Sequence, residues 1–364
     1  RRSSDLWGAL VIVAFTMMAA YYVNDVVAPL KTMLESDLAW TSSDFGFFTG
    51  GYSFLNVFFL MLIWGGLILD RFGIRFTGKL STILMVGGTA LEYYAMTGLA
   101  GPDAQIFGLN EIFGYKAGVF VAFAGYSIFG VGAEVAGITV SKIIAKWFRG
   151  KELATAMGVQ VALARIGSQA GYAVAIPLAR AFGISTPVLL GLVLLLGGMI
   201  AFFVFAVMDK KLDKQMEAAA IAAGTEDEEE KFSFKDVKNI LVNPGFWLIA
   251  LLCVLFYSCV FPFQKFASEL MIIKYGINEN VAGTFAGLPA LGALILTPVF
   301  GGFIDKRGKS ASIMLLGSAM LICVHFIYAI PDINYWLVAI VLMIILGIAF
   351  SLVPSAMWPA VAKI

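Results

Sequence analysis

The chain has 364 residues, of which 60% are hydrophobic and only 13% are charged. A water-soluble domain of this size cannot bury so much apolar surface, so lipid must solvate much of the chain and a water-soluble fold is excluded. The formal net charge of +1 indicates no particular partner, and no nucleic-acid binding is expected.

Apolar runs of about 20 residues recur along the whole chain, and each has the length that a helix needs to cross the hydrocarbon of a bilayer. They predict an all-α membrane protein. The ten predicted spans are residues 7–30, 46–69, 77–99, 117–143, 153–179, 185–208, 246–270, 281–304, 311–330 and 335–361.

The Lys and Arg residues are distributed unevenly between the two sides that alternating spans define. Nineteen of the 25 lie at helix ends or in loops on one side, and only Lys31, Lys116, Arg180 and Lys274 lie on the other. Because cytoplasmic loops carry an excess of basic residues, we expect the N-terminus and the long central loop to be cytoplasmic. The loop 31–45 then lies on the outer side.

A polar stretch separates the sixth and seventh predicted spans and divides the chain. We expect an N-terminal six-helix bundle at 1–208, a cytoplasmic linker at 209–244 and a C-terminal bundle at 245–364 with spans seven to ten. Two further helices are expected to complete the second bundle. The acidic run TEDEEE in the linker is interpreted as solvated loop. An interfacial helix is predicted from apolar residues on one helical face: Phe232, Phe234, Val237, Ile240 and Leu241.

Two similar segments follow the second and eighth spans: GGLILDRFGIR at Gly65–Arg75 and GGFIDKRGK at Gly301–Lys309. Each places two glycines, an acidic residue and basic residues at a cytoplasmic helix end, as expected for two structural repeats. The first resembles the loop motif of the major facilitator superfamily, and the second resembles its weaker counterpart. The resemblance implies a fold of two six-helix bundles. It also implies a cytoplasmic conformational latch that includes Asp70, Arg71, Arg75 and Asp305.

Four longer stretches are similar to lysosomal dipeptide uniporters of this superfamily and to their bacterial relatives. They are Trp147–Ser168, Val260–Glu269, Thr297–Lys309 and Ser355–Ala362. The resemblance implies a carrier for short peptides that works by alternating access around a site near the membrane midplane. One position departs from the wider superfamily, because Tyr126 stands where many members have an arginine tied to proton coupling. This departure argues against proton-driven transport.

Ionisable residues within a span are costly, so each is a candidate for a functional site. At 1.5 Å per residue, Glu134 lies roughly 16 Å from the cytoplasmic end of the fourth span, and Arg165 lies roughly 18 Å from that of the fifth. The two residues thus lie at a common depth. Arginine can bind a carboxylate and glutamate can bind an ammonium, so the pair suits a zwitterion. Both also match the pattern of the peptide carriers. The alternative is a structural salt bridge, and the two interpretations are compatible.

Other polar or aromatic residues within spans are further candidates for substrate binding. Tyr22, Asn24 and Asp25 form a polar cluster in the first span with Tyr21. Asp25 either faces the cavity, where it binds an amine or a proton, or lies close enough to the outer interface to be wet. Tyr257 is predicted near the midplane of the seventh span, beside the helix-breaking Pro262. Trp358 is either a cavity wall or a packed aromatic.

Lys265 and Glu269 are four residues apart and so share one helical face, where they form either an outer gate or an interfacial ion pair. His325 is interpreted as a packed, hydrogen-bonded residue, with a proton relay as the alternative. Glu92 has no evident partner. The three cysteines are interpreted as small core hydrophobes rather than as a disulfide framework.

The sequence therefore predicts a membrane transporter of dipeptides or short zwitterionic peptides, of the uniporter type. The alternative is a superfamily carrier for another organic anion, amino acid or sugar. A receptor or scaffold with the same fold would not need opposite charges at one depth. An enzyme is not expected, because neither HExxH nor GxSxG occurs and there is one histidine.

We expect no cofactor and no metal, and a monomer whose partners are a small-molecule substrate and membrane lipid. No N-x-S/T sequon occurs in the chain. A lysosomal protein usually carries sequons on its lumenal loops, so a bacterial inner membrane is the expected location and a lysosomal membrane the alternative.

Overall fold

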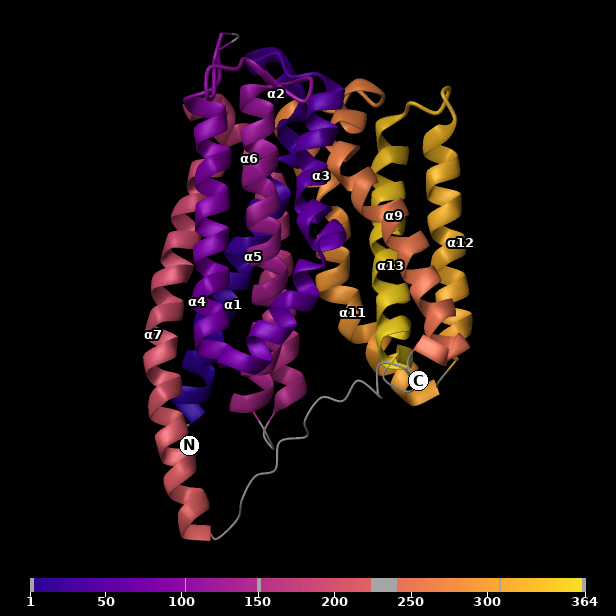
Figure 1. The fold of residues 1–364 in the computed structure, drawn as a ribbon. Helices are drawn as coiled ribbons and strands as arrows, with labels where there is room; N and C mark the ends of the chain where they lie inside the picture. Colours follow the sequence, from indigo (N-terminus) through magenta and orange to yellow (C-terminus); the bar gives the residue numbers. More distant parts are fainter. Residues whose placement is uncertain (1–2, 102, 149–151, 224–240, 308, 362–364) are drawn as a thin grey trace. The chain divides into compact units, whose positions relative to one another are not determined.

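The computed structural model describes residues 3–101, 103–148, 152–223, 241–307 and 309–361. These residues are almost entirely helical (Figure 1). The predicted acidic run and the predicted interfacial helix, apart from Leu241, lie outside the described residues. The helices in chain order are α1 (Ser3–Val26), the short 3-10 helix η1 (Ala28–Leu30), α2 (Lys31–Leu38), α3 (Ser42–Phe58), α4 (Met61–Thr97), α5 (Ala117–Trp147), α6 (Leu153–Phe182), α7 (Thr186–Ala223), α9 (Pro244–Ile273), α10 (Glu279–Ala286), α11 (Leu288–Arg307), α12 (Ser310–Ala329) and α13 (Trp336–Val361).

A small antiparallel hairpin interrupts the helices between α4 and α5. Its strands are β1 (Glu111–Ile112) and β2 (Tyr115–Lys116), and Glu111 pairs with Lys116. The all-α expectation is therefore confirmed for the membrane-embedded part of the described chain, with the hairpin as a loop feature.

Contacts within the chain define two compact units. The first comprises Arg1–Val207 together with Lys265–Gly287, and the second comprises Met208–Gln264 together with Leu288–Ile364. The last turns of α9 and all of α10 thus pack with the first six predicted spans, although they are distant from them in sequence. The two units do not follow the predicted boundaries at 208 and 245, which divide the sequence into two halves, and those boundaries stay a prediction.

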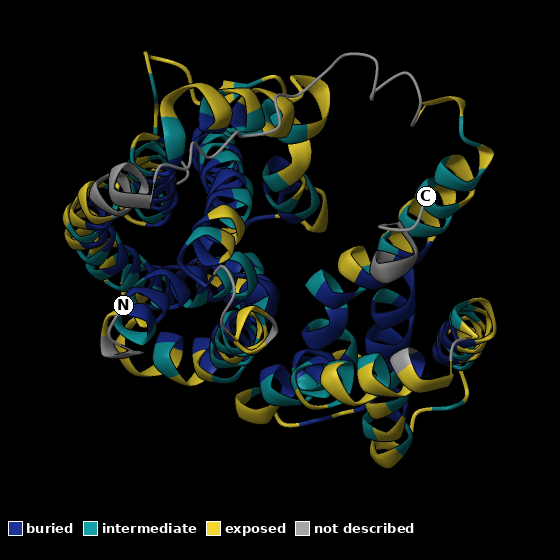
Figure 2. Cartoon of the chain, turned by 90° about the horizontal axis from the view of Figure 1, so that it is seen from below, coloured by how far each residue is buried: buried dark blue, intermediate teal, exposed yellow. Residues whose placement is uncertain are grey.

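Within each unit, buried residues face neighbouring helices and many large apolar residues are exposed (Figure 2). Phe58 is 73% exposed in the first unit and Leu315 is 73% exposed in the second. Such a surface is stable only in an apolar solvent, which is the arrangement expected for helices in a bilayer. Cys259 and Cys323 are also exposed. Their prediction as core residues is wrong, because a thiol suits a lipid-facing surface as well as a core.

Length and composition qualify seven of the described helices as membrane spans, or eight when the bent pair α3 and α4 counts as one. Each of the ten predicted segments falls mainly on described helices, although 46–69 is divided between α3 and α4 and 281–304 between α10 and α11. Two features explain the difference in number. Helix α4 merges parts of the second and third predicted spans across a kink at Gly73, where φ is 76°. Helix α6 has 30 residues, but Arg165 and Arg180 lower its mean hydropathy.

Two close helix crossings set the positions of the polar residues in the first unit. Helix α4 packs against α5, and α1 packs against α6. A Cβ on Gly88 would lie 2.4 Å from the backbone nitrogen of Phe129, and a Cβ on Gly167 would lie 2.1 Å from the carbonyl oxygen of Met18. Glycine lets these backbones approach, as is typical of helix packing in membranes.

Candidate functional site

The last turn of α1 carries a polar group that three other helices complete. The amide Nδ2 of Asn24 donates to Oδ1 of Asp25 at 2.8 Å, and Oγ of Ser168 on α6 donates to Oδ2 at 2.5 Å. The hydroxyl of Tyr126 on α5 donates to the carbonyl oxygen of Asn24 at 2.7 Å. These contacts hold the Asp25 carboxylate in one orientation.

Lys265 on α9 brings a cation to this group. Its Nζ donates to the carbonyl oxygen of Asn24 at 2.5 Å and to the hydroxyl of Tyr126 at 3.1 Å, and it lies 3.6 Å from Oδ1 of Asp25. The side chains of Lys265 and Asp25 are only 15% and 14% exposed. Asp25 and Lys265, which the sequence suggests separately as a substrate-binding and a gate residue, therefore meet, although 240 positions separate them in sequence.

Glu134 and Arg165, the predicted zwitterion pair, lie on α5 and α6 and are half-buried. The hydroxyl of Tyr52 on α3 donates to Oε1 of Glu134 at 2.7 Å. The guanidinium carbon of Arg165 lies 5.7 Å from the ring centroid of Tyr21 on α1. Tyr21 is also four residues before Asp25 on α1, so the two side chains share one helical face.

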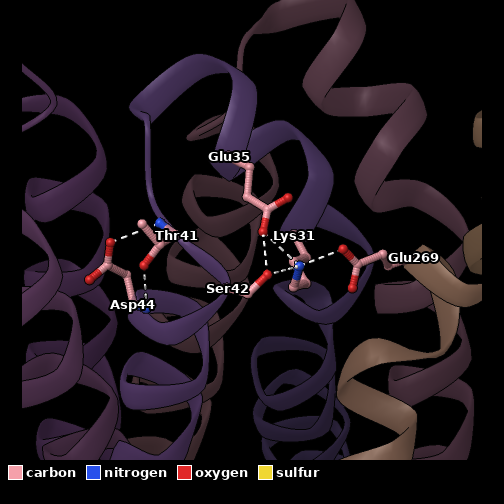
Figure 3. A network of polar contacts seen from close by, with 6 residues as sticks. All are labelled: Lys31, Glu35, Thr41, Ser42, Asp44 and Glu269. Carbon is pink, nitrogen blue, oxygen red and sulfur yellow. Dashed lines mark hydrogen bonds and ion pairs between the residues drawn. The ribbon is translucent and has the colours of Figure 1, made fainter. Parts of the chain in front are cut away.

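A second network, centred on Lys31, lies where α2, α3 and α9 meet (Figure 3). Lys31 is 1% exposed, and its Nζ contacts Oε1 of Glu35 at 2.7 Å, Oγ of Ser42 at 2.9 Å and Oε1 of Glu269 at 2.5 Å. Each donor direction of the ammonium thus has an acceptor. Glu269 and Lys265, which share a helical face, have different partners: Glu269 binds Lys31, and Lys265 binds the Asn24–Asp25 turn.

A capping box at the start of α3 holds Ser42 in place for this network. The backbone N–H of Asp44 donates to Oγ1 of Thr41 at 3.1 Å, and the backbone N–H of Thr41 donates to Oδ2 of Asp44 at 2.8 Å (Figure 3). Two helix-terminal N–H groups are thereby satisfied.

Further polar contacts join α10 to α6. Arg180 donates to Oδ1 of Asn280 at 3.0 Å and forms an ion pair with Glu279, and Nε2 of Gln169 donates to the carbonyl oxygen of Thr284 at 3.3 Å. With the contacts of Lys265 and Glu269, they explain why Lys265–Gly287 packs with the first unit.

The residues of the predicted latch lie at the opposite end of the first unit's helices. Asp70 accepts from Nζ of Lys142 at 2.9 Å, and both side chains are about half exposed. Arg71 lies over the ring of Phe72, and Arg75 has a polar or ring partner. Asp305 belongs to α11, but its side chain lies outside the described residues.

Tyr22, Tyr257 and Trp358 are the three other predicted substrate-binding residues. Tyr22 is 2% exposed, and its hydroxyl donates to the carbonyl oxygen of Pro187 at 3.1 Å, so it is directed at α7. Tyr257 belongs to the second unit and stacks on Phe261 at a centroid distance of 5.1 Å. Trp358 lies on α13, but its side chain is outside the described residues.

Glu92 and His325 are titratable residues with buried polar atoms that have no hydrogen-bond partner among the described residues. Glu92 on α4 is 0% exposed, and neither carboxylate oxygen is hydrogen-bonded. In the second unit, Nε2 of His325 is unpaired, and the imidazole packs edge-on against Phe263 at 4.9 Å. His325 lines a cavity of about 610 Å³ with Ser258, Cys259, Phe263, Leu321, Ile322 and Phe326.

Sequence reasoning missed Lys31, Tyr52 and Ser168 as parts of these networks. The spacing of Lys31 and Glu35 indicates an ion pair on one helical turn, but nothing local indicates Glu269 as the third member. Tyr52 and Ser168 are uncharged residues in apolar runs, where hydropathy does not single them out. In the described part of the chain, no cluster of three His, Cys, Asp or Glu side chains is placed to hold a metal ion.

Comparison with known proteins gives relatives and structural neighbours. The chain is 28% identical to the lysosomal dipeptide transporter MFSD1 of Homo sapiens over 368 residues, which covers 97% of this chain and 72% of that protein. It is 31% identical to MFSD1 of Gallus gallus over 251 residues, which covers 65% of this chain and 54% of that protein.

Two solved structures share the fold. A D-xylose–proton symporter has a TM-score of 0.61 at 16% identity, and the match covers 96% of this chain and 81% of that one. A bacterial homologue of the human lysosomal transporter Spinster, in an inward-facing and occupied conformation, has a TM-score of 0.63 at 12% identity, with 96% and 72% covered. The family description Major Facilitator Superfamily matches residues 10–364. This chain is therefore a multi-pass membrane protein that belongs to the major facilitator superfamily of transporters.

Proposed function

We propose that this transporter carries dipeptides or similar short zwitterions, and that Glu134 and Arg165 bind the two charged ends of the substrate. The observation that carries the proposal is that two opposite charges, each held beside a tyrosine, lie within the helices of one unit. Each charge lies beside a tyrosine of a neighbouring helix: the guanidinium of Arg165 lies over the ring of Tyr21, and the hydroxyl of Tyr52 donates to Glu134. Two opposite, half-buried charges thus lie on α5 and α6, two helices of one unit that contact each other.

The chemistry of the two groups suits a zwitterion. The planar guanidinium of arginine can bind a carboxylate with two parallel hydrogen bonds, and a glutamate accepts from an ammonium. Tyr52 occupies one oxygen of Glu134, which orients the carboxylate and leaves acceptor capacity for a ligand. A substrate with a positive and a negative end compensates both protein charges at once.

The relatives support the same assignment. The lysosomal dipeptide transporters MFSD1 match nearly the whole chain at modest identity. We extend their substrate class to this chain because its paired charges can bind both ends of a peptide. We also propose that the transport is uniport. The tests below distinguish this proposal from proton-coupled transport, and dipeptides from amino acids, sugars and other organic anions as substrates.

We further propose that Lys265 and Glu269 act as a gate on the outer side, with Lys31 as the partner of Glu269. Both gate residues lie near the end of α9, and each binds a residue of the first predicted bundle. Alternating access requires that one side be closed while the other is open. A gate of two ion pairs closes when both form and opens when α9 withdraws from α1 and α2.

Thermal stabilisation by candidate ligands tests the substrate class. A ligand that binds only the folded protein raises the melting temperature by mass action. Dipeptides should stabilise the purified protein, and the effect should disappear in Glu134→Gln and in Arg165→Ala. Glu111→Gln, on the exposed β1 strand, is the matched control and should respond like the wild type.

The same panel contains free amino acids, sugars and organic acids. If one of these classes shifts the melting temperature while dipeptides do not, the peptide assignment is wrong. Uptake of a labelled dipeptide into proteoliposomes, with and without a pH gradient, then separates uniport from proton coupling. Equal initial rates under both conditions support uniport.

A further inference from the structure

We propose that three acceptors, namely the Asn24 carbonyl oxygen, the Asp25 carboxylate and the Tyr126 hydroxyl, form an ammonium-binding subsite for the substrate. Lys265 occupies this subsite as an internal stand-in. The three acceptors are called the ammonium cradle below. This inference rests on the proposed function, since it adds a second cation-binding position to a site for charged peptides.

The contacts of Lys265 show what the cradle accepts. Its Nζ contacts the Asn24 carbonyl oxygen at 2.5 Å and the Tyr126 hydroxyl at 3.1 Å, and lies 3.6 Å from the Asp25 carboxylate. It also lies 5.6 Å from the centroid of the Tyr126 ring. A carbonyl, a hydroxyl, a carboxylate and an aromatic ring around one nitrogen are groups that bind a primary ammonium.

The cradle is built without Lys265. Asn24 and Asp25 come from α1, Tyr126 comes from α5, and Ser168 from α6 holds the second carboxylate oxygen of Asp25. Tyr126 is fully buried, and its ring stacks on Phe129 at a centroid distance of 5.8 Å. These residues keep the acceptors in place when α9 withdraws.

The withdrawal of Lys265 leaves an anion that needs a new partner. The Asp25 side chain is 14% exposed, and breaking a buried pair by removing one charge is strongly unfavourable. A substrate ammonium that replaces Nζ offsets this cost. Opening of the outer gate is then favoured in the presence of a cationic substrate, because the ligand has a higher affinity for the state in which the cradle is vacant.

The position of the cradle relative to the proposed zwitterion pair supports a substrate role. Tyr21 and Asp25 are four residues apart on α1 and so share one helical face, and the ring of Tyr21 lies 5.7 Å from the guanidinium carbon of Arg165. The ammonium in the cradle has two chemical sources in a peptide, the N-terminus and the side chain of a basic residue. The experiments below separate the two.

Chemical rescue tests whether the cradle binds a free ammonium group. Lys265→Ala removes the stand-in, and n-propylammonium is then added during a thermal-unfolding measurement. We expect a saturable rise in melting temperature for Lys265→Ala and none for the wild type, in which the cradle is occupied. The rise should be absent with n-propanol and with choline, which lack a charged N–H donor.

The double variant Lys265→Ala/Asp25→Asn is the control for the location of the amine. Loss of the amine effect in the double variant supports the cradle. An equal rise in both variants, or no rise in Lys265→Ala, overturns the proposal.

Paired ligands then test the substrate role and its source. Binding of Ala-Lys and Ala-norleucine, and of Ala-Ala and N-acetyl-Ala-Ala, is compared between the wild type and Asp25→Asn. Loss of a charge-assisted hydrogen bond should weaken binding about tenfold or more for the ligand whose ammonium enters the cradle. A loss for Ala-Lys alone assigns the basic side chain, and a loss shared by every peptide with a free N-terminus assigns the N-terminus.

Equal binding by Asp25→Asn and the wild type for all four ligands overturns the inference. The proposed function has a separate readout, because dipeptide binding that is lost in Glu134→Gln but kept in Asp25→Asn leaves the zwitterion site intact.

Discussion

At the scale of single residues, the candidate site consists of charged groups that neutral partners orient. Tyr52 orients Glu134, Tyr21 lies under Arg165, and Ser168 with the Asn24 amide orients Asp25. Hydroxyls and amides orient these groups without neutralising them. At Asp25 the neutralising charge is that of Lys265, which a substrate ammonium replaces in the proposal above.

Tyr52→Phe tests the orienting role. The substitution removes the hydroxyl that donates to Glu134 and keeps the ring against Tyr126 and Phe129. Loss of a hydrogen bond to a charged group should weaken dipeptide binding about tenfold. Isothermal titration calorimetry measures the effect, and Tyr94→Phe, on an exposed face of α4, should bind like the wild type. Unchanged binding by Tyr52→Phe would show that Glu134 needs no orienting hydroxyl.

At the scale of helices, glycines at crossing points set the distances between the groups. The Gly88 and Gly125 crossing brings α4 against α5, and the Gly167 crossing brings α6 against α1. These two contacts place the helix faces that carry Tyr126, Glu134 and Arg165. Substitution at a crossing should therefore affect both folding and ligand binding.

Gly88→Ala and Gly87→Ala form a matched pair on α4. A Cβ at Gly88 would lie 2.4 Å from the Phe129 nitrogen and 2.5 Å from the Gly125 carbonyl oxygen, and both are backbone atoms. We expect Gly88→Ala to destabilise the protein by about 1–3 kcal/mol through overpacking. Gly87 has no atom within 4 Å of such a Cβ, so Gly87→Ala should be neutral or slightly stabilising.

Thermal unfolding in detergent, followed by intrinsic tryptophan fluorescence, measures both glycine variants. Equal melting temperatures for the two would contradict the close crossing of α4 and α5.

At the scale of the whole molecule, two ion-pair networks attach the end of α9 to helices from the start of the chain. Lys265 binds the Asn24–Asp25 turn, and Glu269 binds Lys31, which is buried among acceptors (Figure 3). The polar contacts of α10 with α6 extend the attachment. A carrier that opens on this side must break these contacts together, so their strength sets the population of the open state.

Lys31→Met tests this gate. The substitution leaves Glu35 and Glu269 without their shared cation, and loss of one partner of a largely buried pair costs about 3 kcal/mol. Hydrogen–deuterium exchange should increase in α2 and in the last turns of α9. Lys210→Met, at an exposed position on α7, is the matched control and should leave exchange in both segments unchanged.

A charge exchange provides a second test of the same pair. Lys31→Glu alone should increase exchange further, because it places three carboxylates together. The double variant Lys31→Glu/Glu269→Lys restores an opposite charge and should return exchange toward the wild-type level. If the double variant exchanges as fast as the single one, Lys31 and Glu269 do not act as a pair.

The sequence by itself determined that lipid solvates much of the chain and where the helices lie. It also determined the loop motif with its glycines and charges. Each of these depends on properties that add along the chain: hydropathy over about 20 residues predicts a span, and Lys and Arg counts in loops predict orientation. Glu134 and Arg165 could also be selected from the sequence, because a charge in an apolar run is costly wherever the helix lies.

Only the tertiary structure decided which charges meet. Lys265 and Glu269 share a helical face, yet one binds Asn24 and the other binds Lys31, at sequence separations of 241 and 238 residues. Tyr22 and Tyr21 are adjacent, yet one is directed at Pro187 and the other lies beside Arg165. The rotation and height of each helix against its neighbours determine these partners. Close packing at glycines sets both the rotation and the height, and the periodicity of residues within a single helix does not contain this information.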